Sequence, residues 1–402
     1  MKTQRIAIVG YGQRGRIYAN YALRHPDEFK VVAVADINPA GIELAKTKHD
    51  CPTFDGFDSF LKAGVDADVV AIATQDRDHF AHAIACMKKG YDLLLEKPAG
   101  VTLEECNVIN DTAKKLGRKI VVCYVLRYTS FYRKIKEMID SGELGDIVNV
   151  NTSENVGYYH QAHSFVRGPW RNSAESCPMI VAKCCHDTDV MNWLVGKKCN
   201  EVFSYGGLDV FRKERAPKGS SAYCSDCKVD CVYRASDVYK KYVWMRAYYS
   251  NNHLDEEAAA KDLVHSRYDR CVYRCDNDVV DHQICLFSFD SGVTASHSMT
   301  AFSNRIYRDI KISGTRAELF GIMENNSFEV RTFGGETKVY DLSSENVKGT
   351  HGGGDEGLMH NLYLGLNGSP ESTISYFEES IDSYRMAFGA EISRLSGKPF
   401  KI

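Results

Sequence analysis

The sequence predicts an α/β protein in which an N-terminal doubly wound domain precedes a C-terminal α+β domain with a predominantly antiparallel open sheet. In the first third of the chain, short buried apolar runs alternate with helical segments, which is typical of a parallel sheet covered by helices. Beyond residue 124, alternating strands follow one another across short turns, which is typical of antiparallel pairing. The 402 residues also exceed one core of ~150 residues. We expect domains at 1–124 and 125–402.

The first elements form one continuous motif. Residues 6–9 are an apolar, branched run that predicts a strand buried on both faces, and it breaks at Gly10. A helix is expected over 16–24 and a second buried strand over 31–35, closed by Asp36. Between the first strand and the helix, G-x-G-x-x-G is formed by Gly10, Gly12 and Gly15.

A glycine turn between two buried strands, with an acid closing the second, predicts a dinucleotide site and a Rossmann domain. The pyrophosphate would lie at the helix N-terminus, where free amides favour an anion. Asp36 would accept the ribose hydroxyls and repel a 2′-phosphate, so we expect NAD rather than NADP. A glycine-rich turn in another α/β protein would not need this acid. The predicted cofactor-binding residues are Gly10, Gly12, Gln13, Arg14, Gly15, Asp36, Thr74, Glu96 and Lys97.

The remaining elements follow the same periodicities. In the first domain we expect helices over 39–49, 78–89 and 102–116 and strands over 68–73, 91–95 and 120–124. In the second we expect a helix over 130–139 and strands over 147–155, 200–205, 282–289, 293–299, 308–313, 328–331 and 337–340. A helix over 356–366, with Asp355 available as N-cap, and a last helix over about 374–395 complete the chain.

Two residues are candidates for proton transfer. Lys97, in Glu96-Lys97-Pro98, follows a strand at the cofactor edge and could bind a substrate oxygen or pass a proton, or be an ordinary surface lysine. His186 would share a helical face with Lys183 and with Asp189, and histidine titrates near neutrality. The alternative for His186 is a capping or buried hydrogen-bonded residue.

On these residues the chain resembles the Gfo/Idh/MocA oxidoreductases over nearly its whole length. The likeness rests on the glycine turn with Asp36, on Glu96-Lys97-Pro98, on His186 with Asp189 and Trp193-Leu194, and on 314–319. It implies an NAD(P)-binding domain followed by a domain whose open sheet carries substrate contacts and the interfaces of a homodimer or homotetramer. Lys97 and His186 would flank the substrate carbon beside the nicotinamide, and one of them would take the hydroxyl proton of a sugar, cyclitol or related polyol.

The chain departs from the family at one position. Dehydrogenases of the family often carry an acid four residues before the histidine, where this chain has Ala182. Either Lys183 would contact the substrate or Asp187 would replace the acid. Further polar residues are expected to line a sugar pocket or, alternatively, a solvated loop: Arg127, Tyr158, His160, His163, Arg167 and Trp170.

Five of the fourteen cysteines cluster within an insertion at about 210–280. Their spacings are Cys224-x2-Cys227-x3-Cys231 and Cys271-x3-Cys275, which can supply the four soft ligands of a structural zinc ion. We expect Cys224, Cys227, Cys231 and Cys275 as ligands, with Cys271 able to substitute. Unligated thiols are the alternative. The other nine cysteines are expected to be mostly small buried groups.

Composition excludes several classes of partner. A net charge of −3 gives no reason to expect nucleic acid or an acidic membrane, and no apolar run approaches the ~20 residues of a membrane helix. The N-terminus has no signal-peptide core, so a cytoplasmic location is expected. Three functions remain open: a polyol dehydrogenase, a glycoside-cleaving enzyme that uses NAD transiently, and a non-catalytic protein that senses NAD or binds a partner.

Overall fold

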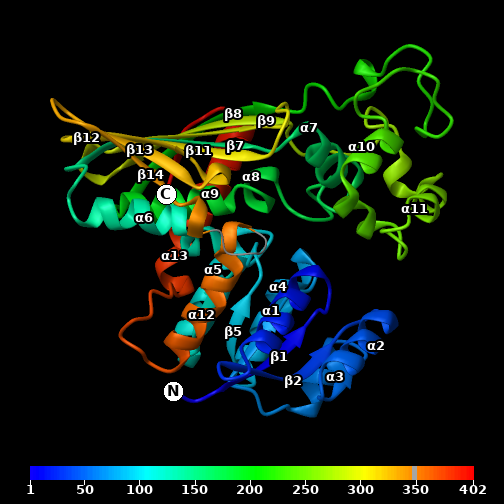
Figure 1. Ribbon diagram of the computed structural model, residues 1–402, viewed down its shortest axis with the longest axis horizontal. Coiled ribbons are helices and arrows are strands. Elements are labelled where there is room, and N and C mark those ends of the chain that lie inside the picture. The colour runs from blue at the N-terminus through cyan, green and yellow to red at the C-terminus, as the bar shows by residue number, and fades with distance from the viewer. Residues whose placement is uncertain (346–350) are drawn as a thin grey trace.

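The computed structural model describes residues 1–345 and 351–402, which form two sheets and a helical insertion (Figure 1). A six-stranded parallel sheet with its helices makes the N-terminal part, and a nine-stranded mixed sheet lies above it in the view of Figure 1. In the described part of the chain no helix has the length and apolar character that crossing a bilayer requires. The expected fold class is confirmed.

The first sheet has the strand order β3-β2-β1-β4-β5-β6, and every neighbouring pair is parallel. Its strands are β1 (Gln4–Val9), β2 (Phe29–Ala35), β3 (Thr53–Phe54), β4 (Val69–Ile72), β5 (Asp92–Leu95) and β6 (Ile120–Val122). Its helices are α1 (Gln13–Arg24), α2 (Pro39–Lys48), α3 (Phe57–Ala63), α4 (His79–Lys88) and α5 (Leu103–Leu116). β3 and α3 were not expected, because elements this short carry no readable periodicity.

The second sheet has the order β14-β13-β12-β11-β7-β10-β9-β8-β15, and only β7 and β10 pair in parallel. Its strands are β7 (Ile147–Asn155), β8 (Cys199–Gly207), β9 (His282–Phe289), β10 (Thr294–Thr300), β11 (Tyr307–Gly314), β12 (Ala317–Ile322), β13 (Ser327–Thr332), β14 (Thr337–Asp341) and β15 (Phe400–Lys401). β12 and β15 were not expected. The alternation along β9 buries Cys285 and Phe287 and exposes Ile284 and Leu286, so the sheet has one covered and one open face.

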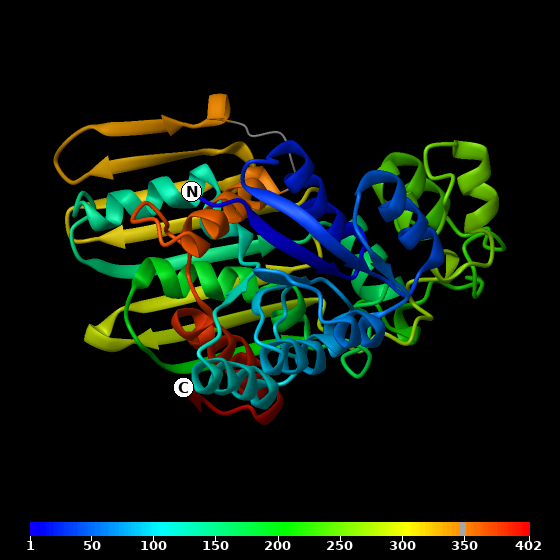
Figure 2. The ribbon, with the colours of Figure 1, turned by 90° about the horizontal axis from the view of Figure 1, so that it is seen from below.

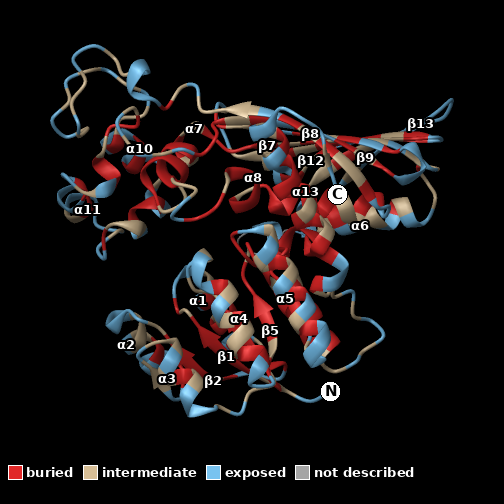
Figure 3. Cartoon of the chain, turned by 180° about the vertical axis from the view of Figure 1, so that it is seen from behind, coloured by how far each residue is buried: buried red, intermediate tan, exposed pale blue. Residues whose placement is uncertain are grey.

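Helices cover the face of this sheet that is turned toward the first domain (Figure 1). They are α6 (Ser130–Asp140), α8 (Met179–Ala182), α9 (Cys185–Val195) and α13 (Phe377–Ser396), while α12 (Gly354–Leu366) packs beside α1. α13 contacts both β8 and α5, so the last helix ties the two sheets together. Figure 3 shows the buried residues concentrated in the strands and in the helix faces turned to them.

The segment 208–281, between β8 and β9, adds no strand to either sheet within the described chain. It contains α10 (Ala235–Lys241) and α11 (Glu256–Leu263), and α7 (Tyr158–His160) packs on it. Two small hydrophobic clusters hold it, one around Tyr239 and Met245 and one around Phe211 and Val272. The insertion therefore projects from one side of the molecule with a modest core of its own (Figure 1).

Candidate active site between the two sheets

The glycine turn has the geometry that close approach of a dinucleotide requires. Gly10 has a φ of +91°, and a Cβ there would lie 2.4 Å from the carbonyl oxygen of Ala73. A Cβ on Gly15 would lie 1.9 Å from the carbonyl oxygen of Gly10, so α1 packs directly on the turn. Around Gly12 the space is open, and α1 begins there without a side-chain cap. The free amides at this helix N-terminus suit a pyrophosphate.

A cavity of about 790 Å³ lies at the carboxyl ends of β1, β2 and β4. Its lining includes four of the predicted cofactor residues: Gly10, Gly12, Asp36 and Thr74. The Asp36 carboxylate accepts hydrogen bonds from the amides of Tyr11 and Asn38, which hold it at the rim. On the opposite wall the lining comes from the insertion, through Ala247, Ser250, Asn251 and His253. The sequence carries no signal for this second wall, because Tyr248 within it lies 235 positions from Gln13 of the turn.

Arg14 and Glu96 form a buried ion-pair network beside this cavity. Arg14 Nε lies 2.5 Å from a Glu96 carboxylate oxygen, and Arg14 Nη2 lies 2.6 Å from Asp355 Oδ1. Burial acts to raise the pKa of Glu96, but the charges of Arg14 and Lys97, together with the hydrogen bonds from Tyr18 and Arg14, outweigh it and the pKa is lowered. Arg14 and Glu96 are therefore both charged and bind each other. Asp355 lies in the first turn of α12, whose N-cap is Gly353, so the expected capping role is wrong.

Lys97 and His186 lie close together although they come from different domains. Lys97 follows β5, and its Nζ donates a hydrogen bond of 3.1 Å to the carbonyl of Ala182. His186 lies in the first turn of α9, is 5% exposed, and has an Nδ1 with no hydrogen-bond partner among the residues described. Burial, reinforced by the charge of Lys97, holds the pKa of His186 well below its usual value. The imidazole is therefore neutral at pH 7 and can accept a proton.

The segment before His186 differs from the continuous helix expected. α8 ends at Ala182 and α9 begins at Cys185, so Lys183 lies between two helices and shares no helical face with His186. Lys183 Nζ instead lies 3.4 Å from the buried carboxylate of Glu154. Asp187 accepts a 3.0 Å hydrogen bond from Arg308 Nε, so it is engaged away from the imidazole. Asp187 therefore does not replace the acid that is absent at Ala182.

A second histidine faces His186. The rings of His351 and His186 lie 6.1 Å apart, and His351 Nδ1 lies 3.0 Å from Asp355 Oδ2. Because Asp355 is paired with Arg14, the loop before α12 is tied to the glycine turn. The sequence indicated only a glycine-rich lead-in to the helix here.

Beside these groups is a cavity of about 510 Å³. Its polar lining comes from several distant parts of the chain and consists of Gln13, Arg14, Thr129, His160, Lys183, Tyr248, Arg308, Glu324, Asn326 and His351. Trp244 adds an aromatic face. Burial, then the charge of Lys183, keeps the pKa of His160 well below its usual value, so His160 is neutral here. Hydrogen-bonding groups around one aromatic face suit a polyhydroxylated ring.

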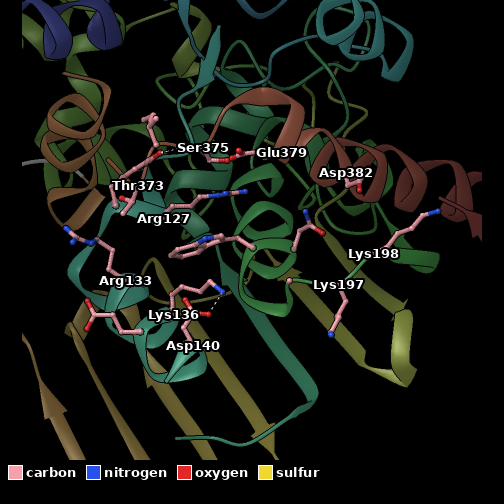
Figure 4. Close-up of a pocket in the computed structure, with 16 residues that line it drawn as sticks. Arg127, Arg133, Lys136, Asp140, Lys197, Lys198, Thr373, Ser375, Glu379 and Asp382 are labelled. Atoms are coloured by element: carbon pink, nitrogen blue, oxygen red, sulfur yellow. Dashed lines mark hydrogen bonds and ion pairs between the residues drawn. The ribbon is translucent and has the colours of Figure 1, made fainter. Parts of the chain in front are cut away.

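Several residues expected in a substrate pocket lie elsewhere. Arg127 makes a bidentate pair with Asp189, at 2.6 Å for both bonds, and stacks over Trp193; it lines a separate cavity of about 580 Å³ (Figure 4). Trp170 Nε1 donates to Asp76 at 3.0 Å. The others pack inside the insertion: Tyr158 against Tyr233, His163 against Tyr268, and Arg167 against Cys224. Their polar atoms serve the fold of the insertion.

The cysteine cluster gathers around a small cavity in the insertion. The lining includes Cys224, Cys227, Cys231 and Cys271 but not Cys275, so the structure favours Cys271 as the fourth thiol. No three of these sulfur atoms lie within 4.8 Å of one another. In the described chain, one group of three possible metal ligands is that close, and it consists of Cys184, Asp187 and His297. All fourteen cysteines are free thiols, and eight of the nine outside the cluster are buried, as expected.

Comparison with known proteins agrees with the two-part fold. Residues 4–124 match the family described as "Oxidoreductase family, NAD-binding Rossmann fold", and residues 136–401 match "Oxidoreductase family, C-terminal alpha/beta domain". "Putative oxidoreductase YteT" of Bacillus subtilis is 27% identical over 85% of this chain and 84% of its own length. An inositol 2-dehydrogenase of Burkholderia cenocepacia is 27% identical over 59% of this chain and 65% of its own length.

The fold is also found in solved structures. The WlbA dehydrogenase of Chromobacterium violaceum, in complex with NADH and UDP-GlcNAcA, has a TM-score of 0.71 at 17% identity and covers 100% of this chain and 96% of its own. An NAD-binding oxidoreductase of Klebsiella pneumoniae has a TM-score of 0.73 at 18% identity, covering 100% and 99%. With the two matched regions spanning nearly the whole chain, the protein belongs to the Gfo/Idh/MocA oxidoreductase family.

Proposed function

We propose that the protein is an NAD-dependent dehydrogenase that oxidises a hydroxyl group of a sugar, an inositol or a related polyol. The observation that carries this proposal is the convergence of Lys97 and a neutral His186 at the end of β5, beside a polar cavity with one aromatic face. Inositol 2-dehydrogenases and a D-glucoside 3-dehydrogenase among the relatives support this substrate class. We expect the protein to act in the cytoplasm, on polyols that are present there.

The chemistry follows from these groups. A bound nicotinamide supplies the hydride acceptor. The neutral imidazole of His186 accepts the hydroxyl proton, and the ammonium of Lys97 hydrogen-bonds the same oxygen as it gains carbonyl character. If the roles are exchanged, the neutral amine of Lys97 accepts the hydroxyl proton and the N–H of the His186 imidazole hydrogen-bonds the oxygen. Lys183 and Arg308, on the cavity wall, are donors for the remaining hydroxyls.

A spectrophotometric screen of NAD reduction against sugars, cyclitols and sugar acids tests the function. Accumulation of NADH with one of these alcohols supports the dehydrogenase. Release of an aglycone from glycosides without net NADH would replace it by the glycoside-cleaving reaction, which Ala182, in place of the acid that dehydrogenases of the family often carry, keeps as the second candidate. A protein that binds NADH but turns over no member of the panel would be a sensor.

We propose NAD rather than NADP as the cofactor. The Asp36 carboxylate stands at the rim of the cavity, where it would accept the ribose hydroxyls and repel a phosphate. Fluorescence titration should give NADH at least about tenfold tighter binding than NADPH, which corresponds to about 1.4 kcal/mol. Equal affinities would contradict this preference.

We propose that the open face of the second sheet joins copies of the chain into a homodimer or homotetramer. Large apolar side chains stand exposed on that face, including Tyr205 at 63%, Leu286 at 52% and Phe320 at 43%. A monomer that exposed so many apolar groups on one sheet would be prone to association. Light scattering that gives the mass of a single chain at micromolar concentration would exclude this assembly.

We also propose that Cys224, Cys227, Cys231 and Cys271 hold a structural zinc ion. Arg167 is fully buried beside them, with Nη2 at 3.6 Å from Cys224 Sγ and an Nη1 that has no partner in the described chain. The largest contributions that favour its charge come from Tyr239, Cys224 and Cys275. Thiolates would compensate this buried cation and would need a metal to stay ionised, because burial raises the pKa of Cys231. Binding of zinc would bring the sulfur atoms of these four cysteines closer together.

The metal content of the purified protein tests the zinc site. We expect about one zinc per chain in the wild type and in Cys51→Ser, a half-buried cysteine outside the cluster, and below about 0.2 in Cys224→Ser/Cys227→Ser. The double variant should also melt earlier, because the insertion has little core of its own. A wild-type protein without zinc after metal-replete expression would leave the cluster as unligated thiols.

A further inference from the structure

The cofactor cavity has a second wall that the family motif does not supply. Ala247, Ser250, Asn251 and His253 line the same cavity as the glycine turn and Asp36. They belong to the insertion, which lies beside the first domain when the molecule is seen from below (Figure 2). A dinucleotide in this cavity would therefore lie between two separate parts of the chain, the Rossmann edge and the insertion.

The wall is held in place from three directions. Tyr248 donates a 2.9 Å hydrogen bond to Gln13 Oε1, which joins the insertion to the glycine turn. Arg246, which is buried, donates to the carbonyl of Tyr239 at 2.8 Å and fixes the start of the wall on α10. Ser250 Oγ donates to Asp262 Oδ2 at 2.6 Å and fixes its end on α11. The segment 246–253 is thus positioned before any cofactor binds.

The chemistry of the wall suits the adenosine half of a dinucleotide. Its neighbours across the cavity are Asp36, Asn38 and Leu44, around the place where the adenosine ribose is expected. The amide of Asn251 and the imidazole of His253 offer donors and acceptors for ribose hydroxyls and phosphate oxygens, and Ala247 leaves room for the base. Trp244 and Tyr248, which precede Ser250 in the insertion, line the cavity of about 510 Å³ instead.

We propose that residues 247–253 of the insertion are a cofactor-binding element in which Asn251 and His253 contact the adenosine half of NAD and slow its release. The inference rests on the proposed use of NAD and adds a site to it. A dinucleotide held on both sides leaves only when contacts with both walls break.

The test is the dissociation rate of NADH from the full-length protein, measured by stopped-flow displacement and followed by NADH fluorescence. In Asn251→Ala/His253→Ala the rate should rise at least about tenfold, a loss of about 1.4 kcal/mol. Tyr248→Phe, which removes the bond to Gln13, should raise it less. The matched control is Asn252→Ala, an exposed neighbour that does not line the cavity and should stay within about twofold of the wild type.

The outcomes separate this inference from the proposed function. Equal rates in the wild type and the double variant, with NADH bound by both, would overturn the inference and leave the dehydrogenase intact. A wild type that binds no NADH would remove both. Thermal melting of each variant checks the fold, which should be unchanged because Asn251 is exposed and His253 only half-buried.

Discussion

Replacing His186 with asparagine should lower kcat for polyol oxidation at least about 100-fold, the lower end of the contribution of a general base. The imidazole is neutral and adjoins Lys97, so its loss removes the proton acceptor and leaves the cofactor cavity intact. We therefore expect the Kd for NADH to stay within about twofold of the wild type. Steady-state kinetics with the alcohol found in the screen, and NADH titration, give the two quantities.

The pH profile and a control variant make this result specific. A base acts when it is deprotonated, and the pKa of His186 is lowered by burial and by Lys97. The acid limb of kcat/KM should therefore lie below pH ~6.5, the ordinary value for histidine, and should be lost in the variant. His360→Asn, on the half-exposed side of α12, should leave kcat unchanged. An acid limb above pH 7, or wild-type turnover in His186→Asn, would assign the proton to Lys97.

Replacing Arg308 with methionine should destabilise the protein by about 3–5 kcal/mol, the cost of leaving buried charge unpaired. Arg308 is buried and pairs with Glu154 and Asp187, which are 0% and 3% exposed, and its backbone amide donates to Glu324 at 2.6 Å. In the variant, Lys183, 3.4 Å from Glu154, remains as its ion-pair partner within the described residues. Denaturant unfolding of both proteins at pH 8 measures the difference.

The loss should shrink as the pH falls. In the wild type the net pKa of Glu154 is lowered, because Arg308 and then Lys183 outweigh burial. This stability is present above the unfolded pKa of ~4.3 and is lost as the pH drops through the folded pKa. In the variant, which lacks the guanidinium of Arg308, protonation of Glu154 removes the cost of burying its charge. The loss of stability should therefore be smaller at pH 5 than at pH 8. The exposed pair of Arg331 is the control: Arg331→Met should cost under about 1 kcal/mol.

Much of this protein could be predicted from local pattern. The apolar run over 6–9, the three glycines and Asp36 predict the Rossmann domain. The buried strand, the glycine turn and the acidic residue all lie within about thirty residues, so they can be recognised without knowing any distant contact. Lys97 could be placed at the cofactor edge because parallel strands present their carboxyl ends together. Seven of the nine strands of the second sheet were predicted through their alternation, whereas β12 and β15 of this sheet and β3 and α3 of the first domain were missed.

The partners of the functional side chains were decided by the tertiary structure. Asp187 pairs with Arg308, 121 positions away, and Arg127 pairs with Asp189, 62 positions away, so neither serves the site expected for it. Residues 247–253 reach the cofactor cavity from an insertion whose sequence indicated only a cysteine cluster. Periodicity reports which face of an element is buried, whereas a pairing across the core depends on how distant segments pack. The sequence alone therefore determined the Rossmann domain of an NAD-binding family and the strand end and helix that carry Lys97 and His186, the two proposed proton carriers. Only the folded chain decided which side chains surround these two residues.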